Sequence, residues 1–513
     1  MNKKASIQIN PSLTTTVKVL RTVCALRFLL LLLFAIPAAV QAQFICTTNS
    51  GTPDTITITG LTTNLVGDVT IPGTIDGLQV VSIADSVFSS SSNMTSIIME
   101  NGIKYIGNST FSIANNSLTN IVIPDSVLTI GHHAFAGNYL ASFTIGNGIV
   151  SIGWYAFYQC GSLTSIRIPD STITIARNAF TYCTGLTNIL IGNHVTSIDM
   201  LAFSGCTSLP NISIPTNISN IARALFAGCS SLTNVTIPDT VTNIDDGAFL
   251  QCGSLSNIII PESVVSLGGE TFMSSGLSSI ALPNSITSIK DQTFYSCGNL
   301  TNIIIPNSVT SIGKNAFDSC ISLTSFVIPD SITNIGDYAF CNCYNLTNVI
   351  IGNQITTIAA GLFDSCSNLT SITIPSCVTN IVGASFSYCT SLTSVYFKGN
   401  APSNGLNLFY GANASIIYYL PNALGWDTTF CDRPTSVWKP QLLGDDRFGI
   451  NTNQFGFNIF WASGMTVVVE GCTNLVNLSW FPLRTNTLSK DLVYFDDPEW
   501  TNYPNCFYRV RWP

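Results

Sequence analysis

Hydrophobic and polar positions alternate with a long period through the middle of the chain. Phenylalanine marks the phase of this pattern, because one recurs at a nearly constant interval. The positions are Phe88, Phe111, Phe135, Phe157, Phe180, Phe203, Phe226, Phe249, Phe272, Phe294, Phe317, Phe340, Phe363, Phe386 and Phe409. A long and regular period of this kind is typical of repeat architectures, in which each unit buries its apolar face only against its neighbours. The pattern therefore predicts a repeat solenoid.

Each repeat combines two short extended pieces with a compact turn. Counted from the Phe, Leu falls at +6 and apolar residues fall at +9 and +11, as in Leu300, Ile303 and Ile305. Alternate apolar residues predict a β-strand, and the Pro that usually follows ends it by removing a ladder donor. A second extended piece comes next, and we expect residues 313–320 to bring Ala and Phe inward through a short helical or 3₁₀ turn. Stacking the units buries these side chains, at roughly 1.5–3 kcal/mol for each large one.

The repeat, as it runs from Ser308 to Phe326, resembles the BspA-like class of leucine-rich repeats, found in surface and secreted proteins of bacteria and some protists. The resemblance implies a right-handed leucine-rich-repeat coil with short parallel β-strands and few short helical turns. It also implies an N-terminal β cap over 43–80 and a solenoid over 81–440 that includes a final capping repeat. Members that act as adhesins bind host extracellular-matrix proteins, but the repeat specifies a scaffold and not a ligand.

The stretch from Met1 to Ala42 has the pattern of a secretory signal. A basic leader precedes the apolar run Phe28 to Ile36, and small residues follow as far as Ala42. Such residues suit a signal peptidase, so we predict cleavage after Ala42, a secreted or cell-surface protein, and no transmembrane helix in the mature chain. The alternative is an uncleaved anchor. It would have to begin near Val23 and tolerate Arg27 to cross about 30 Å of hydrocarbon.

The chain changes character near residue 440. Charged residues make up about 6% of 88–397 but about 16% of 441–513, and the long period is lost. Alternation of apolar and polar residues predicts a small β-rich module over 441–513. This module resembles C-terminal modules of other predicted exported bacterial proteins. We expect it to be either a sorting or wall-attachment module, or a C-terminal cap or accessory sandwich. Cys472 and Cys506 are candidates for a disulfide in an oxidising compartment.

Composition narrows the class of partner. Only 9% of the residues are charged, against roughly 25% in an ordinary globular protein. The 46% of hydrophobic residues exclude intrinsic disorder. The net charge of −8 becomes more negative once the leader is removed, because the leader holds five basic residues and no acids. No basic stripe remains to neutralise phosphates, so the composition argues against nucleic acid as a partner.

A column of cysteines is the most conspicuous candidate for chemistry. Ten lie at +3 from a repeat Phe, namely Cys160, Cys183, Cys206, Cys229, Cys252, Cys297, Cys320, Cys343, Cys366 and Cys389. Zinc sites gather ligands at short spacings such as CxxC, whereas these cysteines are one coil apart. Asn138, Ala114 and Ser275 take the same position in other coils. We therefore predict a buried ladder of free thiols in a slot for small residues, with no metal and no other cofactor. Disulfides between neighbouring coils, or a metal site, are the alternatives.

The sequence offers no arrangement of residues suited to catalysis. The three histidines, His132, His133 and His194, occupy turn positions. Most acids of the repeats follow the strand-ending Pro, where Asp favours a turn. Nothing orients a Ser-His-Asp set. We therefore predict a non-enzymatic protein, with a hydrolase as the less favoured alternative.

The candidate site is therefore a surface. At +10 from the Phe, where an ordinary soluble strand shows polar residues, the middle coils carry apolar ones. The candidate partner-binding face consists of Leu190, Ile259, Ile304, Val327, Ile350 and Tyr396. A row of exposed apolar residues marks a protein-binding patch. The alternative is that a neighbouring chain or a thicker core covers the row.

A second column, at +7, is largely Thr, as in Thr301 and Thr324. Regular Thr ladders resemble ice-binding surfaces, although the adjacent column here is Asn or Ser. The sequence thus predicts an exported scaffold that binds a protein or a cell-surface polymer, with a role in adhesion. Carbohydrate or ice binding is the alternative from another class.

Overall fold

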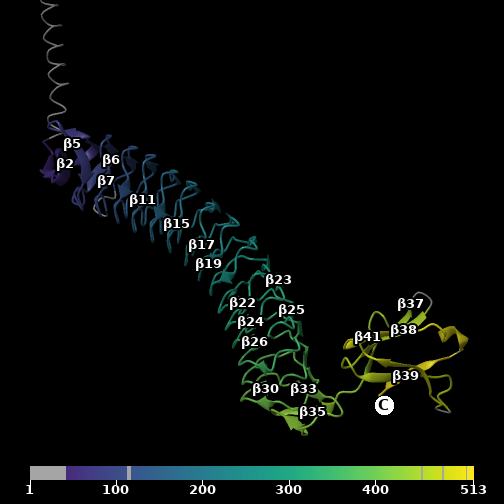
Figure 1. Cartoon of the computed structure of the whole chain (residues 1–513). Coiled ribbons are helices and arrows are strands. Elements are labelled where there is room, and N and C mark those ends of the chain that lie inside the picture. Colours follow the sequence, from purple (N-terminus) through teal and green to yellow (C-terminus); the bar gives the residue numbers. More distant parts are fainter. Residues whose placement is uncertain (1–41, 113–116, 452–453, 477–478, 504, 513) are drawn as a thin grey trace, which may run out of the picture. The chain divides into compact units, whose positions relative to one another are not determined.

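The computed structural model describes residues 42–112, 117–451, 454–476, 479–503 and 505–512 (Figure 1). The predicted leader therefore lies outside the described residues, apart from Ala42. The chain divides after Val264 into two compact units. The repeats wind as a parallel β-solenoid of about 16 turns with almost no helix, so the predicted fold class is confirmed.

Most coils of the first unit contribute one strand of three residues and one of two. Its strands are β1 (Phe44–Asn49), β2 (Thr52–Leu61), β3 (Val66–Ile71), β4 (Thr74–Ile75), β5 (Leu78–Ile83), β6 (Asn93–Met99), β7 (Tyr105–Ile106), β8 (Asn120–Val122), β9 (Thr129–Ile130), β10 (Ser142–Thr144), β11 (Ser151–Ile152), β12 (Ser165–Arg167), β13 (Thr174–Ile175), β14 (Asn188–Leu190), β15 (Ser197–Ile198), β16 (Asn211–Ser213), β17 (Asn220–Ile221), β18 (Asn234–Thr236) and β19 (Asn243–Ile244). At the N-terminal end β1 and β2 are antiparallel, and Phe44 packs edge-on against Phe88 with ring centroids 6.4 Å apart.

The second unit continues the same alternation of strand lengths. Its repeat strands are β20 (Ser266–Leu267), β21 (Ser279–Ala281), β22 (Ser288–Ile289), β23 (Asn302–Ile304), β24 (Ser311–Ile312), β25 (Ser325–Val327), β26 (Asn334–Ile335), β27 (Asn348–Ile350), β28 (Thr357–Ile358), β29 (Ser371–Ile374), β30 (Asn380–Ile381), β31 (Ser394–Phe397), β32 (Ser403–Asn404), β33 (Ile416–Tyr419), β34 (Thr429–Phe430) and β35 (Arg433–Val437). Equivalent strands pair in parallel one repeat apart, as Ser325 of β25 does with Asn348 of β27. Figure 1 shows β22, β24 and β26 following one another as one such row.

The repeat phenylalanines form the centre of the core. Within each unit, rings of successive coils stack with centroids 4.8–6.0 Å apart. Phe317 and Phe340, for example, lie 5.2 Å apart and nearly parallel. All fifteen are almost fully buried. One ring per coil therefore builds an aromatic column in each unit, which explains why the sequence keeps this position so strictly.

The turn around each Phe is not helical, which corrects the expected short helical or 3₁₀ turn. Residues 314–319 form hydrogen-bonded turns, and among the described residues the one helical element is η1 (Trp500–Asn502). Asn315 and Ser319 have φ angles of 53° and 62°, in the left-handed region. A helix would use its amides within the segment. Here the amides of residues 315, 317 and 319 donate instead to carbonyls of the next coil.

The chain beyond residue 440 forms two antiparallel sheets. The first contains β36 (Gln441–Leu443), β37 (Gly449–Asn451), β38 (Gln454–Phe460) and β41 (Leu492–Asp497), and the second contains β39 (Thr466–Cys472), β40 (Phe481–Thr487) and β42 (Phe507–Arg511). Phe457, Trp461 and Val469 lie in a shared buried core. We call this part the C-terminal module.

The structure differs from the expected disulfide between Cys472 and Cys506. Both cysteines are free, and the Cys472 thiol donates to the carbonyl of Asn474. Strand register explains the difference, because Cys472 lies opposite Phe507 and not opposite Cys506. Cys506 lies just before β42 begins, outside the paired residues of this ladder.

Candidate binding surface

The side chains at +10 in the middle coils face solvent. In each three-residue strand the central side chain is directed into the core and the third side chain outward, as with Phe326 and Val327 in β25. In the first unit Leu190 is 57% exposed and Ile259 is 78% exposed. In the second unit the exposed fractions are 59% for Ile304, 59% for Val327 and 54% for Ile350. We call Ile304, Val327 and Ile350 the outer apolar column.

A shallow depression of about 300 Å³ lies within the outer apolar column. It opens between β23 and β25, which belong to separate two-stranded sheets. Ile304 and Val327 line it together with the inward-facing residues Ile303 and Phe326. An apolar side chain of a partner can therefore reach apolar core atoms at this point, which a flat strand surface does not allow.

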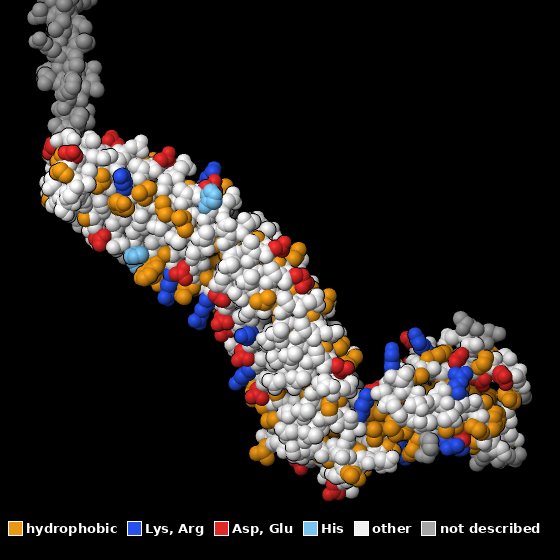
Figure 2. Space-filling view, in the orientation of Figure 1, with side chains coloured by type: hydrophobic (Ala, Val, Ile, Leu, Met, Phe, Trp, Pro, Cys, Tyr) orange, Lys and Arg blue, Asp and Glu red, His pale blue; other side chains and the backbone are white. Residues whose placement is uncertain are grey.

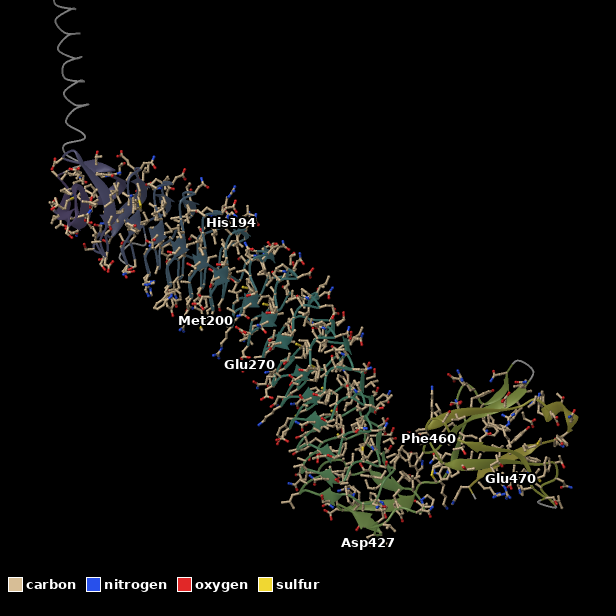
Figure 3. All side chains as sticks on the ribbon, in the orientation of Figure 1. His194, Met200, Glu270, Asp427, Phe460 and Glu470 are labelled. Carbon is tan, nitrogen blue, oxygen red and sulfur yellow. The ribbon has the colours of Figure 1, made fainter. Side chains whose placement is uncertain are left out.

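Tyr396 does not belong to the exposed face, and this corrects the prediction. It occupies the same +10 position but is only 8% exposed. Its ring centroid lies 4.7 Å from that of Trp438 and 5.1 Å from that of Phe460, a residue of the C-terminal module labelled in Figure 3. A salt bridge of 2.8 Å between Lys398 and Asp491 joins the same two parts. The chain's own module covers the end of the column.

The ten cysteines are buried and free, and their thiols do more than fill a slot for small residues. Each thiol donates a hydrogen bond to the carbonyl of the Phe in the preceding coil, at 3.0–3.3 Å. Cys320, for example, donates to Phe294 at 3.2 Å. The cysteine column is therefore a set of bonds between coils.

The other residue types at this position support the same role. Asn138 donates through Nδ2 to the carbonyl of Phe111 in the preceding coil at 2.8 Å. Cys and Asn thus supply a donor to equivalent carbonyls. The predicted slot for small residues is more specific than expected, because it selects for a hydrogen-bond donor as well as for size. Residue 114 lies outside the described residues.

Burial makes these thiols poor nucleophiles and poor metal ligands. It raises the pKa of Cys297 to about 11 and the pKa values of Cys160 and Cys229 to about 12, because the thiolate would be desolvated. The thiolate is the form that attacks electrophiles and binds metals. Among the described residues, no group of three or more His, Cys, Asp and Glu side chains is placed to hold a metal ion.

The Thr side chains at +7 also connect coils. The hydroxyl of Thr347 donates to the carbonyl of Thr324 at 3.0 Å, and that of Thr301 donates to the carbonyl of Ser278 at 3.0 Å. These hydroxyl protons are committed within the protein. This weakens the ice-binding alternative, which needs hydroxyls free to order water.

The histidines serve as turn residues in the structure. The Nδ1 atom of His132 accepts the amide of Trp154 in the next coil at 2.9 Å. His133 stacks on Tyr155 with ring centroids 4.7 Å apart, and its pKa is lowered by burial and by His132. Nδ1 of His194 lies 3.0 Å from the carbonyl of Asp170. These contacts connect neighbouring coils, and they give the three histidines a structural role.

The match to a family identifies the repeats. Segments 68–186, 112–232, 196–324 and 310–423 match the family described as BspA type leucine rich repeat region (6 copies). These segments cover more than half of the chain. The chain therefore belongs to the BspA-type leucine-rich-repeat family.

The fold resembles that of solved leucine-rich-repeat proteins. The chain is similar to a leucine-rich repeat protein from Bacteroides ovatus ATCC 8483, with 28% identity, 74% of this chain and 94% of that chain covered, and a TM-score of 0.59, which supports the fold. It is also similar to a leucine-rich cell surface protein from Faecalibacterium prausnitzii A2-165, with 27% identity, coverage of 74% and 93%, and a TM-score of 0.42. A search of curated proteins found no match. In the described part of the chain, no helix is long and apolar enough to cross a membrane.

Proposed function

We propose that the chain is an exported, non-enzymatic scaffold that binds a protein partner through the outer apolar column, and that it acts in adhesion at the cell surface. The observation that carries the proposal is the row formed by Ile304, Val327 and Ile350, each more than half exposed. Covering such a row with a partner removes apolar surface from water, which favours association by about 25 cal/mol per Å² before the costs of binding.

The surroundings of the column favour a protein over a charged polymer. The visible surface of the repeats consists mainly of uncharged polar groups, with charged side chains scattered among them (Figure 2). The coils that carry the column are held by the thiol and hydroxyl bonds between coils described above, so its residues are presented on a rigid frame. A rigid apolar row with a depression beside it is suited to receive a side chain of a folded partner.

Export is supported by the pattern of segment 1–42, in which a basic leader, an apolar run and small residues follow one another. The C-terminal module covers Tyr396 and Trp438 at the end of the repeats. We propose that this module caps the solenoid. The alternative role in sorting or wall attachment requires a partner on a different face of the module.

Binding of the mature chain, residues 43–513, to a panel of purified matrix proteins and polysaccharides tests the proposal. The test variant carries Ile304→Thr, Val327→Thr and Ile350→Thr, and Thr already stands at this position as Thr236 and Thr373. The matched control carries Val150→Thr, Ile173→Thr and Val265→Thr, three exposed apolar residues seven positions before a Phe, where Thr is common.

We expect at least one protein ligand, bound ten- to a hundredfold more weakly by the test variant and equally well by the control, since each tenfold loss corresponds to about 1.4 kcal/mol. Binding to polysaccharides alone would contradict the proposal. Equal binding by the test variant and the natural chain would also contradict it.

A further inference from the structure

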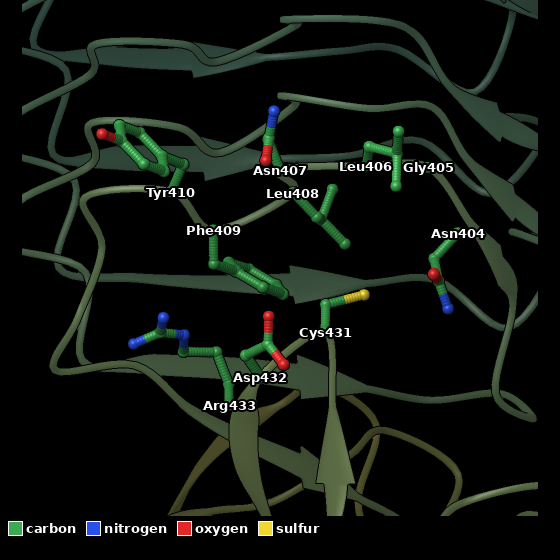
Figure 4. A pocket seen from close by; sticks show the side chains of 10 residues that line it. All are labelled: Asn404, Gly405, Leu406, Asn407, Leu408, Phe409, Tyr410, Cys431, Asp432 and Arg433. Carbon is green, nitrogen blue, oxygen red and sulfur yellow. The ribbon is translucent and has the colours of Figure 1, made fainter.

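The last coil of the solenoid ends beside a cavity that lies apart from the outer apolar column. The cavity has a volume of about 230 Å³ and is lined by Asn404 to Tyr410 on one side and by Cys431, Asp432 and Arg433 on the other (Figure 4). Residues 431 and 432 have φ angles of 50° and 62° and form the two-residue tip of the hairpin between β34 and β35. The liquid volume of one water molecule is about 30 Å³, so the cavity has room for a larger group.

Backbone amides at this edge have lost their usual acceptors. In the preceding coil the amides of Ala384, Phe386 and Tyr388 donate to carbonyls of the last coil at 2.6–3.1 Å. The equivalent amides of the last coil belong to Asn407, Phe409 and Gly411, and no further coil follows. Within the described residues none of these three amides donates a hydrogen bond.

The direction of these amides follows from the repeat. In the preceding coils they are directed along the stack toward the next coil, so those of Asn407 and Phe409 are directed into the space between the last turn and the hairpin tip. Amides without an acceptor in the protein are left to water or to a ligand. Two such donors on one edge can each donate to an oxygen of a bound anion such as a carboxylate.

Charged groups at the cavity define the ligand further. Arg433 donates through Nη1 to the carbonyl of Asn413 at 3.1 Å, while its buried Nε has no partner among the described residues. Asp432 supplies a carboxylate to the same cavity. A simple anion would be attracted by the guanidinium of Arg433 but repelled by the carboxylate of Asp432. A group that carries both a carboxylate and an N–H can pair the carboxylate with Arg433 and donate the N–H to Asp432.

Exposed apolar side chains stand at the rim. Leu406 is 86% exposed and Tyr410 is 59% exposed, and both line the cavity. They offer contacts for a side chain or an α-carbon next to the bound carboxylate. An inorganic anion has no apolar atoms that could make such contacts.

We propose that this cavity binds the free C-terminal carboxylate of a peptide. The carboxylate accepts the amides of Asn407 and Phe409 beside Arg433, and the last N–H of the peptide donates to Asp432. The terminal carboxylate is the group that backbone concavities of this kind capture in other recognition modules. The site is separate from the outer apolar column and does not depend on the function proposed for it.

The probe is N-acetylglycylglycine, compared with the same compound amidated at its C-terminus and with acetate. Binding to the mature chain is followed by the NMR signal of the Phe409 amide after labelling with ¹⁵N-phenylalanine. The variants are Arg433→Gln and Asp432→Asn, and melting temperature checks that each remains folded.

We expect saturable movement of the Phe409 signal with N-acetylglycylglycine and binding at least tenfold weaker for the amidated compound, because charge-assisted hydrogen bonds are the stronger ones. Arg433→Gln should weaken binding of the free acid, and Asp432→Asn should tighten binding of acetate. An unmoved Phe409 signal, or equal binding of acid and amide, would overturn the proposal. A third result would also overturn it, namely that the natural chain binds neither N-acetylglycylglycine nor acetate while the Asp432→Asn variant binds acetate. The carboxylate of Asp432 would then be the group that accepts the amides.

Discussion

Replacing one cysteine of the column tests whether the thiol acts as a hydrogen-bond donor or only as a small side chain. We choose Cys320, which is fully buried and donates to the carbonyl of Phe294 at 3.2 Å. Cys320→Ser keeps a donor at nearly the same size, whereas Cys320→Ala removes it. A slot that selects only for small apolar residues would favour Ala over Ser, because burying a hydroxyl without a partner is costly.

The expected magnitude follows from the acceptor. The carbonyl of Phe294 also accepts the amide of Cys297 in its own coil at 3.1 Å, so removing the thiol leaves it half satisfied and not orphaned. One net hydrogen bond contributes about 0.5–1.5 kcal/mol. We therefore expect the Ser variant to be more stable than the Ala variant by about 0.5–1.5 kcal/mol, with both less stable than the natural chain.

Urea unfolding of the mature chain, followed by far-ultraviolet circular dichroism, measures the difference. Cys341 provides the control, because it is also buried but, unlike the ten column cysteines, its thiol donates to no carbonyl in the described part of the chain. Cys341→Ser should therefore be no more stable than Cys341→Ala. An Ala variant at 320 that equals or exceeds the Ser variant would refute the donor role.

Three further predictions concern ionisation, modularity and the C-terminal module. Stability should be constant up to about pH 9 and fall at higher pH. The reason is that buried thiols whose pKa values are raised from 9.0 to about 12 ionise first in the unfolded chain. Thermal unfolding between pH 7 and pH 11 checks this. Deleting one repeat, residues 318–340, should leave a folded and shorter protein, because each coil contacts only its neighbours. Ending the chain at residue 437 should instead uncover Tyr396 and cause aggregation. Light scattering measures both outcomes. Arg511 and Arg509, at 2.7 and 2.8 Å, lower the pKa of Glu470. The contribution of the Glu470 carboxylate to stability is therefore present above pH 4.5 and lost as pH falls through the lowered pKa. The melting temperature of the Glu470→Gln variant should accordingly depend less on acid pH than that of the natural chain.

Features that repeat were predictable from the sequence, and features that depend on a single place in the chain were not. The phase of Phe317 and its equivalents was enough to predict coils, because each coil contacts only its neighbours. The donor role of Cys320 was partly visible, since Asn138 also carries a donor, but Ala114 at the equivalent position obscured it.

Tyr396 shows why one predicted site residue was wrong. It follows the +10 rule of its column, and its burial comes from Phe460, which lies far along the chain and outside the repeat pattern. Likewise, the pairing of Cys472 depends on the register of β39 and β42, which composition does not reveal. The cavity beside Arg433 exists because stacking stops at the last coil, and only the structure shows what lies beside that edge.

Hydrogen–deuterium exchange of the complex tests most directly whether a partner meets the outer apolar column. The mature chain is compared alone and bound to the protein ligand identified in the binding panel. Slower exchange on binding should be confined to β23, β25 and β27, with unchanged exchange in β24 and β26, which belong to the other row of strands. Protection limited to the turns around the repeat Phe residues or to the C-terminal module, with none in β23, β25 and β27, would contradict the account.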